Sequence, residues 1–271
     1  MPLEERFFRS LLLPAGCFKT TARNRLGDLD RLIVEAAPAA DLLHVLDAGV
    51  SSGVTTLELL EALERAGRRV RAVACDLSIR GRLIRLAPGF DALLDTQGRL
   101  LQLSAPGFVR SRAWASASLK GRLLSGLFQL LESFLKNRAG SDVALVTREL
   151  SRRDDVELVE QDVLVERPDW RGAFHIIRAA NLLNRSYFDE TALTRAAALL
   201  ASYLAPDGLL AICRTHEEDG GNHATIFRKR GEGLIVEARL GQGSEVEDLA
   251  VAATTSQVVA PGVGSTPLEA P

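Results

Sequence analysis

The sequence predicts a doubly wound α/β fold with a mostly parallel, seven-stranded sheet whose last two strands form an antiparallel hairpin. Short apolar runs alternate with longer helical patterns along most of the chain. Helices inserted between strands imply parallel pairing through right-handed crossovers, which cover both faces of a sheet. Near the end of the chain, two extended runs follow each other closely and are joined by Gly231-Glu232-Gly233, which is typical of a hairpin.

Each element of this fold is predicted from its own local pattern. Apolar or alternating runs predict the seven strands, at 42–49, 70–76, 156–162, 174–181, 208–215, 223–230 and 233–241. Leucine and alanine at helical spacing predict three intervening helices, at 55–67, 78–87 and 189–204.

Composition places the chain among ordinary globular proteins. It has 271 residues, of which 46% are hydrophobic and 25% are charged, enough for a sizeable core in one domain. The formal net charge of −2 gives no reason to expect a nucleic-acid partner that depends on bulk positive charge. We therefore expect no nucleic-acid partner.

Cysteine usage and the terminal segments indicate a cytoplasmic protein. Cys17, Cys75 and Cys213 are far apart and show no CxxC spacing, so neither a disulfide framework nor a metal site is expected. The N-terminus lacks the pattern of a secretory signal, and no apolar run approaches the length of a membrane span. We expect a helical segment at 1–40, a main domain at 41–250 and a flexible tail at 251–271.

An insertion at about 81–140 separates the second and third strands. Sixty positions exceed an ordinary crossover of one helix. Two short extended runs surround "DTQG" at 95–98, and "SLKGRLLSGLFQLLESFLKN" has Leu and Phe at helical spacing. We expect residues 100–138 to be a partly mobile cover over a substrate, while a dimer face and a membrane contact stay open as alternatives.

The turn after the first strand is the strongest candidate for a ligand site. It reads "VLDAGVSSGVTTLELL" at 45–60, and open α/β sheets bind ligands at the carboxyl ends of their strands. Gly49 and Gly53 allow the backbone to approach a ligand, and Ser51 supplies a hydroxyl and an amide. A nicotinamide site favours G-x-G-x-x-G, whereas this turn follows Asp47, which disfavours a pyrophosphate.

Acidic residues also end the next two predicted strands. Asp76 ends the second strand, where a carboxylate can accept both hydroxyls of a ribose, and Asp162 ends the third. Helix capping is the simpler alternative for both residues, and more so for Asp162. For the Gly/Ser turn, the simpler alternative is a tight connection between strand and helix that binds no ligand.

Acid-ended strands, the Gly/Ser turn and the closing hairpin together resemble the class I S-adenosylmethionine-dependent methyltransferases. Within that family, "AGVSSG", "ACDLSIR" and "IIRAAN" are similar to stretches of the chemotaxis-receptor glutamate methyltransferases, although Val54-Thr55-Thr56 replaces their two glutamates and proline. The resemblance implies a Rossmann-like methyltransferase fold with S-adenosyl-L-methionine as cofactor. The cofactor-binding residues that we predict are Arg25, Asp47, Gly49, Ser51, Gly53, Asp76, Leu77, Asp162 and Val163.

The resemblance also assigns parts of the cofactor to particular residues. Asp47 and Gly49 would lie near the methionine portion, Asp76 would bind the ribose, and Asp162 with Val163 would lie beside the adenine. Arg25 matches the arginine of a Thr-x-x-x-Arg stretch, "TARNR" at 21–25, that approaches the cofactor in the chemotaxis subgroup.

Polar residues after the fourth and fifth strands are the candidate catalytic group. Arg178 or Arg185 offers a bidentate clamp for an anionic acceptor, Asn181 and Tyr187 can orient its oxygen, and His216 can act as a general base. For Arg25 and His216, a solvated surface side chain is an equally good interpretation.

Methyl transfer to an oxygen or nitrogen of a small-molecule acceptor, possibly apolar, is the function that we predict. The alternatives are a protein carboxyl methyltransferase and a non-catalytic nucleoside-binding scaffold. A homodimer is possible. Because a sulfonium donor needs mainly in-line approach of the acceptor at about 3 Å, few obligatory catalytic groups are expected.

Overall fold

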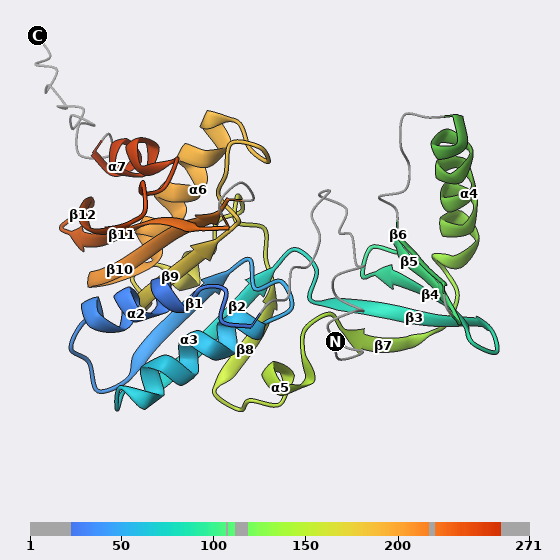
Figure 1. The fold of residues 1–271 in the computed structure, drawn as a ribbon, viewed down its shortest axis with the longest axis horizontal. Coiled ribbons are helices and arrows are strands. Elements are labelled where there is room, and N and C mark those ends of the chain that lie inside the picture. The colour runs from blue at the N-terminus through green and yellow to red at the C-terminus, as the bar shows by residue number, and fades with distance from the viewer. Residues whose placement is uncertain (1–22, 107, 112–118, 217–219, 256–271) are drawn as a thin grey trace, which may run out of the picture.

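The computed structural model describes residues 23–106, 108–111, 119–216 and 220–255, which form two sheets (Figure 1). The larger sheet has seven strands in the order β8-β2-β1-β9-β10-β11-β12. Their bounds are β1 Leu43–Ala48, β2 Val70–Asp76, β8 Val156–Glu160, β9 Phe174–Ala180, β10 Leu204–Thr215, β11 Asn222–Arg230 and β12 Gly233–Leu240.

Strand pairing confirms the predicted fold class. β8, β2, β1, β9 and β10 run parallel, β11 is antiparallel to β10, and β12 is antiparallel to β11. The carboxyl ends of the parallel strands therefore lie along one side of the sheet, which we call its binding edge, and the turn after β1 lies there. That edge is where an open α/β sheet holds a ligand.

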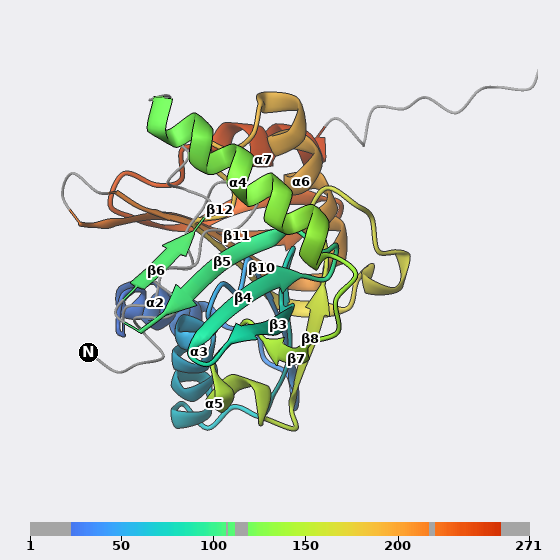
Figure 2. The ribbon, with the colours of Figure 1, turned by 90° about the vertical axis from the view of Figure 1, so that its right-hand side faces the viewer.

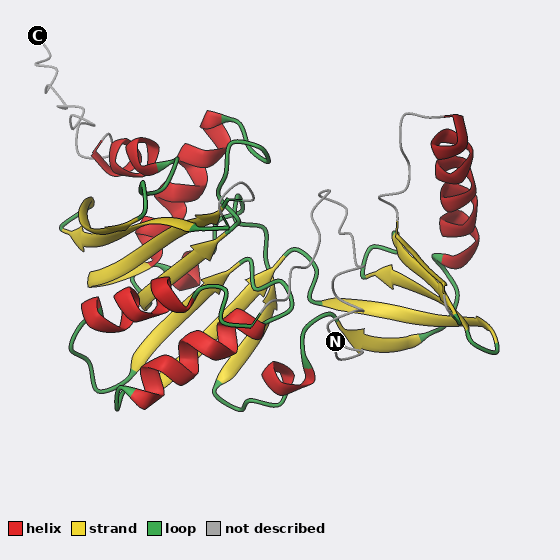
Figure 3. Cartoon of the chain, viewed as in Figure 1, coloured by secondary structure: helices red, strands yellow, loops and turns green. Residues whose placement is uncertain are grey.

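Helices cover both faces of this sheet, as Figure 3 shows. One face packs on α2 (Gly27–Ala36) and α3 (Val54–Arg65) through a core that includes Leu29, Leu60 and Val45. The other face packs on α6 (Glu190–Tyr203) and α7 (Glu247–Thr255). Burial on both sides explains the near-continuous apolar runs of the central strands.

The insertion folds as a separate lobe with its own sheet. Five antiparallel strands lie in the order β6-β5-β4-β3-β7, and a long helix, α4, packs against them (Figure 2). Their bounds are β3 Arg80–Ala87, β4 Phe90–Asp95, β5 Leu100–Ala105, β6 Phe108–Ser111, β7 Ser141–Ala144 and α4 Leu119–Leu135. The predicted extended runs around "DTQG" are the β4–β5 hairpin.

The predicted helix at 78–87 is wrong, because these residues form strand β3. β3 pairs with β4 on one side and with β7 on the other. A Cβ atom at Gly81 would lie 2.9 Å from the carbonyl oxygen of Leu94, so this close pairing requires glycine. The apolar residues of a short run satisfy both helical and strand periods, and the partner strands decided between them.

The lobe has a compact core of its own. Phe128 and Leu135 of α4 pack against Ile84, Leu94 and Leu103 on one face of the sheet. Residues 100–138 therefore include a buried central strand as well as α4. This differs from our expectation of a mobile cover, because an open cover would expose apolar side chains that are buried here.

Two short connections join the lobe to the larger domain, and they pair with each other. The Leu145 amide donates to the Ile79 carbonyl oxygen at 2.6 Å. After them, Thr147 caps α5 (Arg148–Ser151) through its side chain, which accepts from the Leu150 amide. The lobe therefore begins a few residues after Asp76 in the sequence, and it is attached where the strands of the large sheet have their carboxyl ends.

The ends of the chain only partly overlap the described residues. Most of the expected segment at 1–40 and most of the expected tail at 251–271 lie outside them, including Cys17 and Thr21. Helix α7 continues to Thr255, past the point where the tail was expected to begin. Within the described ranges, no helix is long and apolar enough to span a bilayer.

Candidate functional site

The turn after β1 is held against the end of β2 by backbone hydrogen bonds. The amides of Gly49 and Val50 both donate to the carbonyl oxygen of Cys75, at 2.8 and 3.0 Å. The Ser51 amide donates to Oδ2 of Asp76 at 2.9 Å. The structure therefore brings the Gly/Ser turn and Asp76 together. Two of these three bonds end on backbone, so the turn is set by the strand pairing itself.

Ser51 takes a left-handed backbone conformation, with φ of 54°. Two further non-glycine residues at this edge of the sheet do the same, Asn24 and Asn181, both with φ of 56°. Such conformations cost about 1–3 kcal/mol each and gather at functional sites. A fourth such residue, Asp207, lies near the other end of β10, so these conformations are not confined to the candidate site.

The two glycines of the turn have different surroundings. A Cβ at Gly49, where φ is 82°, would meet the Leu182 side chain at 3.3 Å, which is tight. A Cβ at Gly53, where φ is 84°, would overlap Leu150 of α5 at 2.3 Å. The space over Gly53 is thus filled by the protein, which corrects the prediction that this glycine makes room for a ligand.

Asp47 is also satisfied from within the protein. Its carboxylate accepts Nε and Nη2 of Arg178 at 2.9 and 2.8 Å, and the Thr56 hydroxyl at 2.5 Å. Asp47 and Arg178 are direct neighbours in the register of β1 and β9. Asp47 therefore faces its own buried cation rather than a cationic group of a ligand.

Arg178 is fully buried, which corrects its predicted place on the rim of a catalytic site. Its exposed fraction is 0%, and its Nη1 donates to Asp30 of α2 at 2.9 Å. Burial disfavours the charge, but attraction to Asp47 and Asp30 outweighs it, so the pKa of Arg178 lies above its ordinary value. A guanidinium in an apolar strand needs such partners.

Asp30 is the second carboxylate of this cluster, and sequence reasoning missed it. Burial raises its pKa to about 6, although the attraction to Arg178 acts in the opposite direction. The cluster holds two carboxylates and one guanidinium, so the second carboxylate is only partly compensated. Together these groups tie α2, β1, α3 and β9 directly below the Gly/Ser turn.

A polar cluster next to this one contains Arg25 and Asn181. The Asn181 side chain bridges to Thr215 at the end of β10, accepting from its amide at 2.8 Å and donating to its hydroxyl at 3.3 Å. Nη1 of Arg25 reaches the same hydroxyl at 3.5 Å, and Asn222 donates to the Arg25 carbonyl oxygen at 2.7 Å. Thr215 and Asn222, which the sequence analysis did not single out, thus bring the predicted residues Arg25 and Asn181 together.

Arg25 lies in a partly buried position beside Thr215 and Asn222. Its Nε is buried and has no hydrogen-bond partner among the described residues. Burial, the largest influence, lowers the pKa of the Arg25 guanidinium below its ordinary value. A partly desolvated guanidinium of this kind is suited to bind an anionic group.

Leu77, Asp162 and Val163 lie at the ends of β2 and β8. Leu77 directly follows Asp76 and is 52% exposed, unusual for a leucine. Oδ1 of Asp162 accepts the Leu164 amide at 2.9 Å, so this carboxylate orders its own turn. Val163 is partly buried against the main core. β8 neighbours β2, so these residues extend the same edge.

Tyr187 and His216 lie in the segments that follow β9 and β10. Tyr187 is 53% exposed, and its amide donates to the Asn184 carbonyl oxygen. The His216 ring packs edge-to-face on His223 with centroids 4.5 Å apart. Arg185, another polar residue of this segment, is paired with Glu190 at 2.6 Å. None of these side chains joins the Arg25–Asn181 cluster through a hydrogen bond in the described structure.

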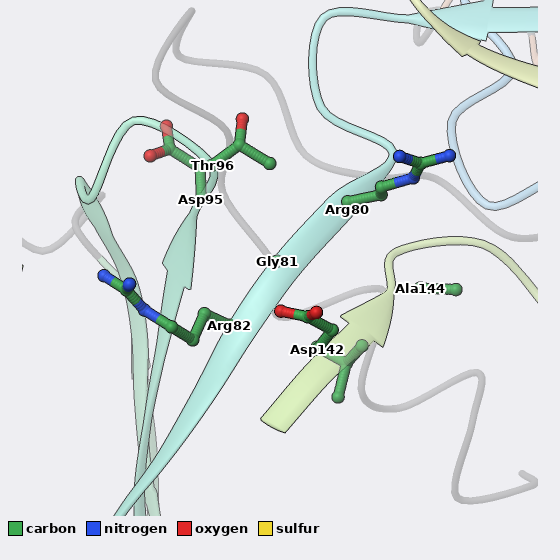
Figure 4. A pocket seen from close by; sticks show the side chains of 8 residues that line it. Arg80, Gly81, Arg82, Asp95, Thr96, Asp142 and Ala144 are labelled. Atoms are coloured by element: carbon green, nitrogen blue, oxygen red, sulfur yellow. The ribbon is translucent and has the colours of Figure 1, made fainter. Parts of the chain in front are cut away.

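A cavity of about 550 Å³ lies in the insertion lobe (Figure 4). Arg80, Arg82, Asp95, Thr96 and Asp142 supply its polar lining. The Thr96 hydroxyl and the Arg80 amide both bond to Glu160, the last residue of β8, which links this cavity to the larger domain. No pattern in the sequence pointed to it, because its lining comes from three separate strands and a turn.

No family model and no curated protein sequence matches the chain. Solved structures resemble it at low identity. The CMeT domain of the citrinin polyketide synthase is 16% identical, with a TM-score of 0.34, over 71% of this chain and 35% of that one. The [4+2]-cyclase SpnF is 14% identical, with a TM-score of 0.35, over 70% and 46%.

A further similar structure is the N-methyltransferase NodS from Bradyrhizobium japonicum WM9 in complex with S-adenosyl-l-homocysteine. It is 11% identical, with a TM-score of 0.39, over 80% of this chain and 76% of that one. The chain spans between about a third and a half of the length of the first structures that it resembles.

Proposed function

We propose that the chain is an S-adenosylmethionine-dependent methyltransferase that acts on an oxygen or nitrogen of a small molecule. The observation that carries this proposal is the Gly/Ser turn whose Ser51 amide bonds to Asp76 at 2.9 Å, with Asp162 in the turn that follows the neighbouring strand β8. Carboxylates at this edge repel a pyrophosphate but accept the hydroxyls and amino groups of a nucleoside. The catalytic unit is residues 41–250 together with Arg25 and α2, with the lobe as its insertion.

In this proposal, Asp76 binds the ribose and Arg25 binds the cofactor's carboxylate. Arg25 is a partly buried guanidinium whose Nε has no partner among the described residues, and a carboxylate matches its planar fork of donors. Asp47 acts on the cofactor only indirectly, because its oxygens are bonded to Arg178 and Thr56. The acceptor lies beyond the ends of β9 and β10, near Asn181, Tyr187 and His216.

Calorimetry with S-adenosylhomocysteine tests the ribose contact. Asp76→Asn keeps an acceptor for the Ser51 amide but removes the charge, and we expect about tenfold weaker binding or more. Asp155→Asn is the matched control, because Asp155 pairs with Arg153 at the opposite edge of the sheet. Equal affinity of both variants and the wild type would contradict the assignment of Asp76.

The role of Arg25 is separable from that of Asp76 by the choice of ligand. Arg25→Met should weaken S-adenosylhomocysteine about tenfold, since a charge-assisted contact is lost. Binding of 5′-methylthioadenosine, which has no carboxylate, should not change. If both ligands weakened equally, Arg25 would support the fold of the edge rather than hold the carboxylate.

Ligands that co-purify with the protein test the proposal as a whole. Mass spectrometry of the released small molecules should detect S-adenosylmethionine or S-adenosylhomocysteine. A nicotinamide nucleotide would overturn the proposal. Binding of S-adenosylhomocysteine without methylation of any acceptor would instead favour a nucleoside-binding scaffold, and methyl groups labile to base on a protein would favour carboxyl methylation.

A further inference from the structure

Charge is divided very unevenly between the two parts of the molecule. Residues 80–144 contain ten Lys and Arg but four Asp and Glu, a formal net charge of +6. The rest of the chain contains 23 Lys and Arg and 31 Asp and Glu, a formal net charge of −8. The overall charge of −2 therefore conceals a basic lobe attached to an acidic domain. A lobe of this charge attracts an anionic partner.

Most basic residues of the lobe lie in the part of its sequence that contains α4. Seven Lys and Arg but one acidic residue, Glu132, occur between Asp95 and Asp142. The Glu132 carboxylate accepts the Leu100 amide at 3.0 Å, so it is engaged by the sheet. Lys136 and Arg138, directly after α4, are exposed.

α4 also exposes apolar side chains that its own lobe does not cover. Phe128 and Leu135 face the sheet, whereas Leu130 is 72% exposed and Phe134 is 63% exposed. These two lie one turn apart on the outer side of the helix, which stands at the end of the lobe away from the large sheet (Figures 1 and 2). The Arg138 guanidinium lies 4.7 Å from the centroid of the Phe134 ring.

We propose that the outer face of α4, which carries Leu130 and Phe134, docks on an anionic lipid surface together with the exposed Lys136 and Arg138 that follow the helix. Apolar side chains beside basic ones on one helix are the combination that enters the boundary between headgroups and acyl chains. Each Lys or Arg near an anionic membrane contributes binding energy, and the apolar pair supplies burial. A second α4 would bring like charges together, and a phosphate backbone would leave Leu130 and Phe134 without a partner.

Co-sedimentation of the full chain with vesicles tests this proposal. Phosphatidylcholine vesicles that contain phosphatidylserine should bind the protein at low ionic strength, and pure phosphatidylcholine vesicles should bind it at least about tenfold more weakly. Added salt should weaken the binding, because the charges are exposed and screened. Circular dichroism should verify that each variant is folded.

Two double variants separate the apolar contribution from the charged one. Leu130→Gln with Phe134→Gln should reduce binding at least about tenfold, whereas Ile235→Gln, at an apolar residue 48% exposed on β12, should not. Lys136→Glu with Arg138→Glu should abolish binding. Arg69→Glu with Arg71→Glu makes the same change in net charge at exposed residues of the large domain and should leave binding unchanged.

Several results would overturn the proposal. One is the absence of binding to anionic vesicles, and another is equal binding by the α4 variants and their controls. A wild-type dimer in solution that Leu130→Gln with Phe134→Gln converts to monomer would identify α4 as a self-association face. Binding to an oligonucleotide that depends on Lys136 and Arg138 but not on Leu130 and Phe134 would identify a nucleic-acid surface.

Discussion

Arg178 in the large sheet and Arg138 after α4 carry the same charged group in opposite surroundings. Arg178 is fully buried and bonded to Asp47 and Asp30. Arg138 is exposed and lies over the ring of Phe134. The charge of Arg178 is internal and holds the elements below the candidate site in place. The charge of Arg138 is at the surface, where it is available to a partner.

The largest effect should come from removing the buried cation. Arg178→Met leaves two buried carboxylates without their partner, and we expect a loss of about 3–5 kcal/mol in the free energy of unfolding. Arg239→Met removes a guanidinium that is half exposed in a surface pair with Glu247, and it should cost less than about 1 kcal/mol. Urea denaturation measures both. Similar losses would show that burial does not distinguish the two pairs.

The free energy of unfolding should depend on pH through Asp30 in the large domain, because burial raises the pKa of Asp30 to about 6. The folded state holds this proton more tightly than the unfolded state, so the contribution of Asp30 is full below about pH 4 and is lost as pH rises through 6. This loss is on the order of 2–3 kcal/mol.

Asp30→Asn isolates this contribution from that of the other acids. The stability of the variant relative to the wild type should rise between pH 4 and pH 7, because the variant has no carboxylate to ionise at this position. Asp91→Asn, in an exposed pair with Arg85 in the lobe, is the control and should show no such rise. A pH-independent difference for Asp30→Asn would mean that Asp30 titrates normally.

An effect smaller than that of Arg178→Met should appear at the turn. Gly53→Ala adds a Cβ that overlaps Leu150 at a left-handed position, and we expect a loss of about 2–4 kcal/mol. Gly172→Ala has a similar φ of 66° but open space, so it should cost about 1–2 kcal/mol. Gly53→Ala should cost less in a Leu150→Ala background than in the wild type, because the overlapping side chain is then absent. If the two alanine variants were equally stable, the packing against α5 would not matter.

Local patterns in the sequence determined the large sheet and its binding edge. The alternation of strands and helices, the Gly/Ser turn and the terminal hairpin each depend on neighbouring residues, and the structure confirms their arrangement in one sheet. The approach of Ser51 to Asp76 follows from this alternation, because parallel neighbours end at the same edge. The β4–β5 hairpin and α4 were predicted for the same reason.

Only the tertiary structure decided the partners of the buried polar groups. Arg178 stands in an otherwise apolar strand, so the sequence required a counter-charge, but it did not reveal that Asp47 and Asp30 supply it. The sequence predicts space for a ligand at Gly53, but Leu150, almost a hundred positions away, fills that space. The local pattern predicts a helix at β3, but pairing with β4 and β7 makes it a strand. Periodicity records how a segment faces a core, whereas these outcomes depend on which distant residue occupies the opposite side of a contact.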